Sequence, residues 1–294
     1  MRPAPVVPPI LLADTRLDWS RTYVMGVINA TPDSFSDGGR TLDPATAVAH
    51  GLALAAAGAD VLDVGGESTR PGADPVPVEE ELRRVLPVIR GLCSASATPI
   101  SIDTTKAAVA EAACAAGACL VNDVSGLTAD PDLGRVTARA GAALVVMHRR
   151  GTPRTMQDRV DYADLVGEIA ASLAASLDLA VAAGVPRERI FLDPGIGFGK
   201  DIEGNLRLLR CGHHLRSRLG RPVLVGPSRK SFIGKLTGAP VEARLPGTVA
   251  ACVLARVFGA DVVRVHDVAE VRQALQVTDA LLGLGPDGAA APAG

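Results

Sequence analysis

The sequence predicts an α/β protein, a single-domain (β/α)8 TIM barrel, and three observations support this fold. Short apolar runs recur eight times, segments with helical spacing separate them, and a glycine precedes several of the runs. Near-continuous apolar runs are typical of parallel strands that are buried on both faces. Eight strand–helix units favour a closed barrel, and an open doubly wound sheet is the alternative.

The expected strands are rich in β-branched and other apolar residues. In chain order they cover residues 23–28, 61–64, 100–102, 120–124, 144–147, 190–192, 223–225 and 262–265. Four strands share a Gly-Ala joint, as in GADVLDV at 58–64 and GADVVRV at 259–265. This weak internal repeat indicates one repeated structural unit.

The segments between the strands are predicted to be helices, since apolar residues follow helical spacing, for example over 82–89 and 165–177. Asp43-Pro44 and Asp130-Pro131 mark two helix starts, because Asp caps free backbone N–H groups and Pro fits the first turn. A left-handed residue that ends a helix is easiest for glycine. The glycines in such places are Gly58, Gly117, Gly141, Gly184, Gly220 and Gly259.

The length of 294 residues could hold two average domains, but one barrel commonly uses about 250 residues. We expect an N-terminal tail and lead-in at 1–20, the barrel at 21–284 and a C-terminal tail at 285–294.

The composition is that of a globular protein, with 48% hydrophobic and 21% charged residues. The net charge of -2, mixed along the chain, offers no field for a polyanion, so nucleic acid is not an expected partner. Five cysteines without a CxxC pair suit a reducing cytosol. No apolar run approaches the roughly 20 residues that span a bilayer, and no signal peptide is apparent. The sequence therefore predicts a cytoplasmic protein without a membrane partner.

Polar residues follow the expected strands, at the end where barrel enzymes place their active sites. They include Asn29, Thr69, Arg70, Asp103, Asn122, His148, Asp193, Lys230, Ser231, Arg264 and His266. Arg70, Lys230, Arg264 and His266 offer donors that suit phosphate oxygens. Asn29, Asp33 and Asp37 could supply oxygen to Mg²⁺. Asp103, Asn122 and Asp193 are then left for a neutral, donor-rich ring.

Several of these residues have a structural alternative. Asp103 or Asp193 could be a helix cap. His148 has no partner in a metal or nucleophile motif and is better explained as a structural histidine, as are the helical residues His50, His213 and His214. Gly195, Gly197 and Gly199 resemble a phosphate cradle but equally fit a flexible loop. Zinc motifs and a GxSxG nucleophile elbow are absent from the sequence.

Eight segments, read together, resemble the dihydropteroate synthase family from Val24 to Asp267. They are VMGVINATPDSFSDGG at 24–39, DVGGESTRPGA at 63–73, SIDTTK at 101–106, NDVSG at 122–126, MHRRGTPRTMQ at 147–157, LDPGIGFGK at 192–200, SRKSFIG at 228–234 and RVHDV at 264–268. The resemblance implies a transferase of folate biosynthesis. It would join 6-hydroxymethyl-7,8-dihydropterin diphosphate to p-aminobenzoate and release pyrophosphate.

The resemblance also implies roles for individual residues. Its implied catalytic residues are Asp33, Asp103, Lys230 and Arg264. The implied pterin ligands are Asp103, Asn122, Met147, Asp193, Lys230 and Arg264. Those for the diphosphate are Asn29, Thr69, Arg70, Arg264 and His266, with Asn29 also binding Mg²⁺. Those for p-aminobenzoate are Phe35, Arg70, Pro71, Phe198, Lys230 and Ser231.

Family members are commonly homodimers, and sulfonamides, which resemble p-aminobenzoate, are expected to compete with it. Two other functions share the pterin-binding barrel. A methyltransferase that uses methyltetrahydrofolate does not need the phosphate ligands Asn29, Arg70, Arg264 and His266. A catalytically silent pterin-binding paralogue would be expected to lose the residues of the first two βα loops.

Overall fold

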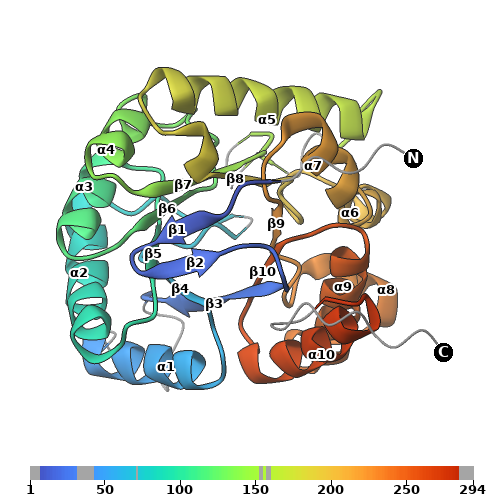
Figure 1. The fold of residues 1–294 in the computed structure, drawn as a ribbon, viewed down its shortest axis with the longest axis horizontal. Coiled ribbons are helices and arrows are strands. Elements are labelled where there is room, and N and C mark those ends of the chain that lie inside the picture. The colour runs from blue at the N-terminus through green and yellow to red at the C-terminus, as the bar shows by residue number, and fades with distance from the viewer. Residues whose placement is uncertain (1–6, 32–42, 71, 152–154, 157–159, 285–294) are drawn as a thin grey trace.

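Eight parallel strands form one sheet that closes on itself, with helices outside it (Figure 1). The computed structural model describes residues 7–31, 43–70, 72–151, 155–156 and 160–284. The strands are β3 (Tyr23–Asn29), β4 (Val61–Gly65), β5 (Ile100–Asp103), β6 (Leu120–Asp123), β7 (Ala143–Met147), β8 (Ile190–Asp193), β9 (Leu224–Val225) and β10 (Val262–Val265). The sheet order is β8-β7-β6-β5-β4-β3-β10-β9, and a parallel bridge between Leu192 and Val223 joins its two ends. The predicted (β/α)8 barrel is therefore confirmed, and the open sheet is excluded.

Helices follow the barrel strands in turn, two of them after β8 and two after β9. They are α1 (Pro44–Ala56), α2 (Val78–Ala95), α3 (Ala107–Ala115), α4 (Leu133–Arg139), α5 (Leu165–Ala182), α6 (Ile202–Leu209), α7 (Gly212–Leu219), α8 (Ser231–Thr237), α9 (Leu245–Val257) and α10 (Val268–Leu281), with short 3-10 turns at Arg187–Arg189 and Val241–Ala243. The six glycines predicted to end helices all have positive φ, as expected.

One of the two predicted helix starts is confirmed. The Asp43 carboxylate accepts from the backbone N–H of Ala45 at 3.2 Å and caps α1. The start predicted at Asp130 lies before the observed one, because α4 begins at Leu133. The Asp130 carboxylate accepts from the N–H of Asp132 at 3.0 Å just before α4, and also from the N–H of Ala107 at 2.8 Å, the first residue of the neighbouring helix α3.

The side-chain period of two sorts the strand residues into an outer and an inner set. Outward residues such as Val24, Leu62 and Val263 pack under the helices. Inward residues near the strand starts are also apolar, and form a second cluster with Met25, Val61, Leu120, Phe191 and Val262. In four of these strands the next inward residue, two positions further along, is polar. These four residues are Asp63, Asn122, Asp193 and Arg264. The barrel interior therefore changes from apolar to polar toward the carboxyl ends of the strands.

A two-stranded hairpin of β1 (Ile10–Leu12) and β2 (Thr15–Leu17) lies across the ring of strands (Figure 1). Its Leu12 is 0% exposed and belongs to the same apolar cluster as Phe191. Trp19 follows it and places its ring edge-on to Phe191, with the centroids 6.0 Å apart. The hairpin therefore covers the N-terminal end of the barrel. The sequence pattern predicts only a tail and lead-in at 1–20, so this hairpin is an addition to the predicted fold.

One described helix, α5, is long and apolar enough to cross a membrane, with 18 residues and a mean hydropathy of 1.7. Its Ile169, Leu173 and Leu177 are buried in the core between the sheet and the helices. Burial of this kind is typical of a core helix in a globular barrel.

Candidate active site

The predicted site residues within the described part of the chain lie at or just beyond the carboxyl ends of the strands. Asn29, Asp103, Asn122, Met147 and Asp193 end β3, β5, β6, β7 and β8 or lie in their last two residues. Arg264 lies in β10, while Thr69, Arg70, Phe198, Lys230, Ser231 and His266 follow strands. Parallel strands of one barrel bring these ends to the same rim. Asp33, Phe35 and Pro71 lie outside the described residues.

Arg264 is half-buried and is the centre of an ionic network with two buried acids. Its Nε donates to Asp63 Oδ2 at 2.6 Å, and its Nη2 donates to Asp103 Oδ2 at 2.7 Å. Asn122 Nδ2 donates to the same Asp63 oxygen at 3.0 Å. Burial opposes the charge of the guanidinium, but the two carboxylates prevail and raise the pKa of Arg264. The arginine therefore stays charged and is held from two sides.

The two acids at the ends of β5 and β8 are nearly enclosed. Burial raises the pKa of Asp103 to about 7, although the charge of Arg264 opposes the rise. Burial likewise raises the pKa of Asp193 to about 6, against the N–H of Gly195, which donates to Asp193 Oδ1 at 2.7 Å. The helix-cap alternative is wrong for both acids. Asp103 pairs with Arg264, and Asp193 accepts from a loop N–H while Asp201 caps α6.

Lys230 completes the polar group from the start of α8. Its Nζ lies 4.1 Å from the centroid of the Phe198 ring. Burial and the nearby charge of Arg264 lower the pKa of Lys230 to about 8, while Asp193 and Asp103 oppose the drop. Phe198 also packs with Met147, Val124 and Met156 in a small apolar cluster at this rim. The site thus combines charged groups with one apolar wall.

His266 lies just after β10, beside Ser228. The Ser228 hydroxyl oxygen is 3.0 Å from His266 Nδ1, and it accepts from the backbone N–H of His266 at 3.2 Å. Burial and the charge of Arg264 lower the pKa of His266 to about 3, and the charge of Arg70 contributes. The imidazole is therefore neutral near pH 7 and can donate one N–H to an anion. Arg70 is exposed on the loop after β4, within electrostatic reach of both His266 and Lys230.

Five polar atoms at the rim have no hydrogen-bond partner among the described residues. Three are acceptors, Asp103 Oδ1, Asn122 Oδ1 and Asp193 Oδ2, and two are donors, Arg264 Nη1 and Lys230 Nζ. None of them is among the fully enclosed polar atoms. Gly65 and Gly226 leave space beside Asp103 and Arg264, because a Cβ at either glycine would come within 4 Å of those side chains. The rim can therefore bind a polar ring with several donors.

His148 serves the structure, as the sequence analysis favoured. Its Nδ1 lies 2.9 Å from the Nζ of Lys200, which is only 4% exposed. The ammonium also donates to the carbonyls of His148, Pro194 and Gly195 at 2.9 to 3.1 Å. Lys200 thus ties the loop after β7 to the loop after β8. Burial and the charge of Lys200 lower the pKa of His148 to about 3.

The glycine-rich segment after β8 is a tightly packed loop. Gly195, Gly197 and Gly199 all have positive φ. A Cβ on Gly195 would lie 2.0 Å from the carbonyl oxygen of His148, and a Cβ on Gly197 would lie 2.9 Å from the Lys230 side chain. Glycine is therefore required here for close approach to neighbouring protein atoms.

Asn29 suits a magnesium ion that is held partly by a substrate. Its side chain makes no hydrogen bond to another described residue, so the amide oxygen is available. The described residues contain no group of three or more His, Cys, Asp or Glu that could hold a metal. Mg²⁺ commonly keeps waters and phosphate oxygens with one or two protein ligands, and Asn29 fits that pattern.

Asp63 and Lys200 are not among the residues predicted from the sequence. Asp63 stands inside the apolar strand 61–64, and an acid within such a run was the available signal. Lys200 ends the glycine-rich motif at 192–200, where only the glycines drew attention.

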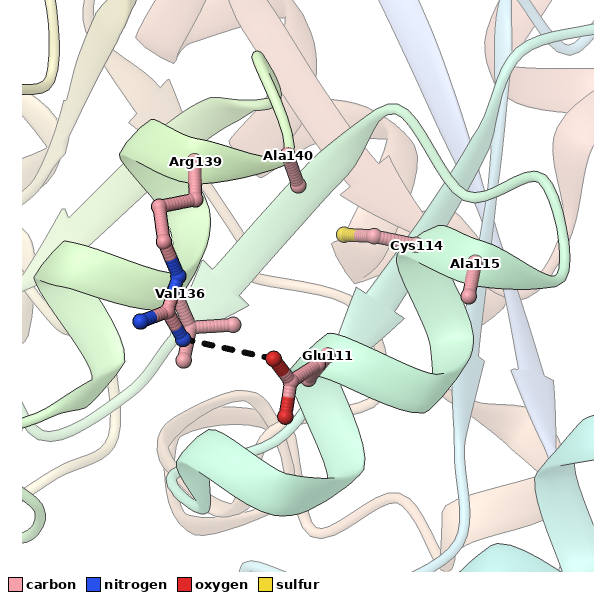
Figure 2. A pocket seen from close by; sticks show the side chains of 6 residues that line it. All are labelled: Glu111, Cys114, Ala115, Val136, Arg139 and Ala140. Carbon is pink, nitrogen blue, oxygen red and sulfur yellow. Dashed lines mark hydrogen bonds and ion pairs between the residues drawn. The ribbon is translucent and has the colours of Figure 1, made fainter.

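Two surface pockets lie away from this rim. One of about 290 Å³ lies between α3 and α4, where the Arg139 and Glu111 side chains point toward each other and pair at 3.2 Å (Figure 2). The other, of about 1040 Å³, is lined by Arg21, Asp60 and Arg272, among others, near the starts of β3 and β4. In both pockets the charged groups named here are already paired with each other.

Comparison with known proteins gives a consistent result. Residues 25–266 match the family model described as pterin binding enzyme. A dihydropteroate synthase from Synechocystis is 50% identical over 276 residues, which are 93% of this chain and 95% of that protein. The structure of a Yersinia pestis dihydropteroate synthase with a sulfonamide drug complex aligns with a TM-score of 0.89 at 40% identity, over 94% of this chain and 99% of that chain.

Structures of the Xanthomonas albilineans dihydropteroate synthase are similarly close. The complex with 4-aminobenzoic acid aligns with a TM-score of 0.88 at 47% identity, over 95% of this chain and 100% of that chain. A second structure of that protein holds 7,8-dihydropteroate and aligns with a TM-score of 0.85 at 44% identity, with the same coverage.

Proposed function

This chain belongs to the dihydropteroate synthases of the pterin-binding enzyme family, and from that premise we propose how its own residues perform the reaction. The enzyme is a transferase of folate biosynthesis. It condenses 6-hydroxymethyl-7,8-dihydropterin diphosphate with p-aminobenzoate, and it releases 7,8-dihydropteroate and pyrophosphate. The observation that carries the residue roles is the set of five unpartnered donors and acceptors around Arg264 at one rim.

The pterin binds inside the rim, between the ends of β5, β6 and β8. The open oxygens of Asp103, Asn122 and Asp193 accept from the ring N–H and amino groups, and Lys230 donates to an acceptor of the ring. Met147 provides an apolar contact within the cluster that includes Phe198. The guanidinium of Arg264 covers the ring face.

The diphosphate binds beside the pterin, toward β3 and β10. Arg264 Nη1 and the neutral His266 donate to its oxygens, with Thr69 and Arg70 from the loop after β4. Asn29 is the residue that would hold Mg²⁺ at this part of the site. When bound, the ion neutralises diphosphate charge.

Transfer proceeds by cleavage of the bond between the pterin methylene carbon and the diphosphate oxygen. Pyrophosphate leaves with the bonding electrons, the p-aminobenzoate nitrogen forms the new bond to carbon, and the amine then loses a proton. Donors around the leaving group stabilise charge that develops during cleavage, so they favour the transition state over the ground state. We assign to Asp33 and Asp103 the stabilisation of the positive charge that develops on the pterin.

The second substrate binds at the outer part of the rim. We assign Phe198, Lys230 and Ser231 to its pocket, and we assign its further contacts to Phe35, Arg70 and Pro71 of the first two βα loops. Phe198 and Lys230 support this placement, since the lysine lies over the aromatic ring. Sulfonamides compete with p-aminobenzoate for the pocket.

The protein acts in the cytoplasm as a homodimer, and residues 21–284 form its one barrel domain. Its five free cysteines fit a reducing compartment. Among the described residues, most exposed large apolar side chains lie between positions 236 and 282, on α8 to α10 and the turn between them, which offers a surface for a second copy.

The test is direct. Purified protein is mixed with the pterin diphosphate and p-aminobenzoate in the presence of Mg²⁺, and released pyrophosphate and 7,8-dihydropteroate are measured. Equal amounts of both products are expected. A protein that binds the pterin but releases no pyrophosphate would be the silent paralogue and would overturn the proposal.

A further inference from the structure

Asp63 is an acid in the middle of an otherwise apolar barrel strand. It lies in β4 one inward position before Gly65, and it is 0% exposed. Its Oδ2 accepts both from Arg264 Nε at 2.6 Å and from Asn122 Nδ2 at 3.0 Å. The roles described so far do not use this carboxylate.

Stability alone does not explain an acid at this place. Asp63 Oδ1 is enclosed and has no hydrogen-bond partner among the described residues. An enclosed oxygen without a partner is unfavourable, and well-packed apolar residues often replace buried ion pairs without loss of stability. The preceding inward position of the same strand, Val61, shows that the interior accepts an apolar side chain nearby.

The contacts of Asp63 instead fix the orientation of two other side chains. Asp63 holds Arg264 by Nε while Asp103 holds it by Nη2, so the plane of the guanidinium cannot rotate and Nη1 is left for a ligand. Because Asn122 turns its Nδ2 toward Asp63, its Oδ1 is left as an acceptor at the rim. Lysine at position 264 could not reproduce this geometry, since an ammonium is a point charge without a planar fork.

We propose that Asp63 is a positioning residue for the transfer reaction, which acts by holding the Arg264 guanidinium in the plane that serves the leaving diphosphate. This inference rests on the proposed function. It predicts that the charge of Asp63 matters for kcat only while an arginine stands at position 264, because an uncharged amide oxygen at position 63 can still accept from Asn122.

A double-mutant cycle tests this dependence. Asp63→Asn, which keeps the volume and removes the charge, is made in the wild-type and in the Arg264→Lys background, and kcat and KM for the pterin diphosphate are measured. In the wild-type background kcat should fall by about 10- to 100-fold, which corresponds to the free energy of one hydrogen bond to a charged group. In the Arg264→Lys background the further loss should stay below about threefold. An equal loss in both backgrounds would overturn the proposal.

Asp261 offers a matched control. It is also 0% exposed and paired with an arginine, Arg216, but it precedes β10 and so lies at the opposite end of the strand from the rim. Asp261→Asn should lower the thermal midpoint yet change kcat by less than about threefold. If it reduces kcat as much as Asp63→Asn, the effect is general destabilisation and the proposal fails.

Two further outcomes are separable. If Asp63→Asn does not fold, Asp63→Glu replaces it in the cycle with the same expected dependence on Arg264, because one added methylene moves the carboxylate out of place. If the wild-type protein itself releases no pyrophosphate, the proposed function fails, whereas an additive cycle in an active enzyme contradicts only the role of Asp63.

Discussion

At the scale of single residues, three groups of the rim have pKa values near neutral pH: the buried Asp103 and Asp193 and the half-buried Lys230. Asp103 has a pKa of about 7, Asp193 of about 6 and Lys230 of about 8, in each case mainly because of burial. In the proposed function the two acids accept hydrogen bonds from the pterin most strongly when they are ionised, and Lys230 donates with full charge only when it is protonated. We therefore expect kcat/KM for the pterin diphosphate to fall as the pH drops below about 7 and to fall again above about 8.

The alkaline limb provides an internal control for this pH profile. The charge of Asp193 raises the pKa of Lys230, so Asp193→Asn should move the alkaline limb to lower pH. A profile that stays flat between pH 5 and 9, or an alkaline limb unmoved by the substitution, would contradict the assignment.

Asp193 should also govern pterin affinity. In Asp193→Asn one oxygen can still accept from the Gly195 N–H, but an amide N–H₂ would then face the donor edge of the pterin. We expect binding of 6-hydroxymethylpterin, measured by calorimetry, to weaken by about 10- to 100-fold.

Asp201→Asn is the control for damage to the same loop. Asp201 caps α6 through the Gly204 N–H and is exposed. Its replacement should leave the pterin affinity near that of the wild type. Unchanged affinity in Asp193→Asn would remove this acid from the pterin site.

Magnesium should act through Asn29. Inorganic pyrophosphate should bind more weakly when a chelator removes Mg²⁺, since the ion neutralises its charge. In Asn29→Ala the affinity without Mg²⁺ should stay close to that of the wild type, while the gain from added Mg²⁺ should shrink. If Mg²⁺ strengthens binding equally in both proteins, Asn29 is not its ligand.

The candidate site could be predicted from sequence where a polar residue directly follows an apolar run. Asn29, Asp103 and Asp193 were found in this way, because the ends of parallel strands must meet. Asp63 was missed because the sequence pattern does not show which residues within a barrel strand already lie near the rim. Lys200 was missed because its four acceptors include backbone carbonyls from two separate loops.

At the scale of elements, the barrel strands were predictable because each one is a buried apolar run. The expected strand at 61–64 and the observed β4, Val61–Gly65, differ by one residue. The hairpin at the N-terminus was not predictable in the same way. Its strands have three residues each, too few to establish a period of two, and their burial depends on a barrel floor formed by distant residues such as Phe191.

The hairpin should contribute to stability through its buried face. Leu12 is 0% exposed under the barrel, whereas the adjacent Leu11 is 54% exposed. Leu12→Ala should lower the free energy of unfolding by about 2–5 kcal/mol, because it removes apolar contact and leaves a cavity. Leu11→Ala should change it by less than about 0.5 kcal/mol. Denaturant unfolding of both variants checks this, and equal effects would show that the hairpin does not pack as described.

At the scale of the whole molecule, the exposed apolar side chains are unevenly distributed. Among the described residues they concentrate on the helices that precede and follow β10, with Leu254 and Val257 on α9 and Val277 and Leu281 on α10. These two helices pack against each other and lie beside α8 on one side of the barrel (Figure 1). We call the part of the surface that carries these exposed side chains of α9 and α10 the apolar wall. Exposed apolar side chains that gather on neighbouring helices mark a protein interface more often than scattered ones do.

The oligomeric state tests whether this wall is the interface of the proposed homodimer. Leu254→Glu should convert the dimer to a monomer, because a carboxylate would be buried between two apolar surfaces without a partner. Leu179→Glu on α5 is the matched control, since Leu179 is 52% exposed and Leu254 is 53% exposed. Light scattering after size exclusion should give a dimer mass for the wild type and the Leu179 variant only. A monomeric wild-type protein would contradict the proposed homodimer. A Leu254→Glu variant that remains dimeric would show that the dimer interface lies on another surface.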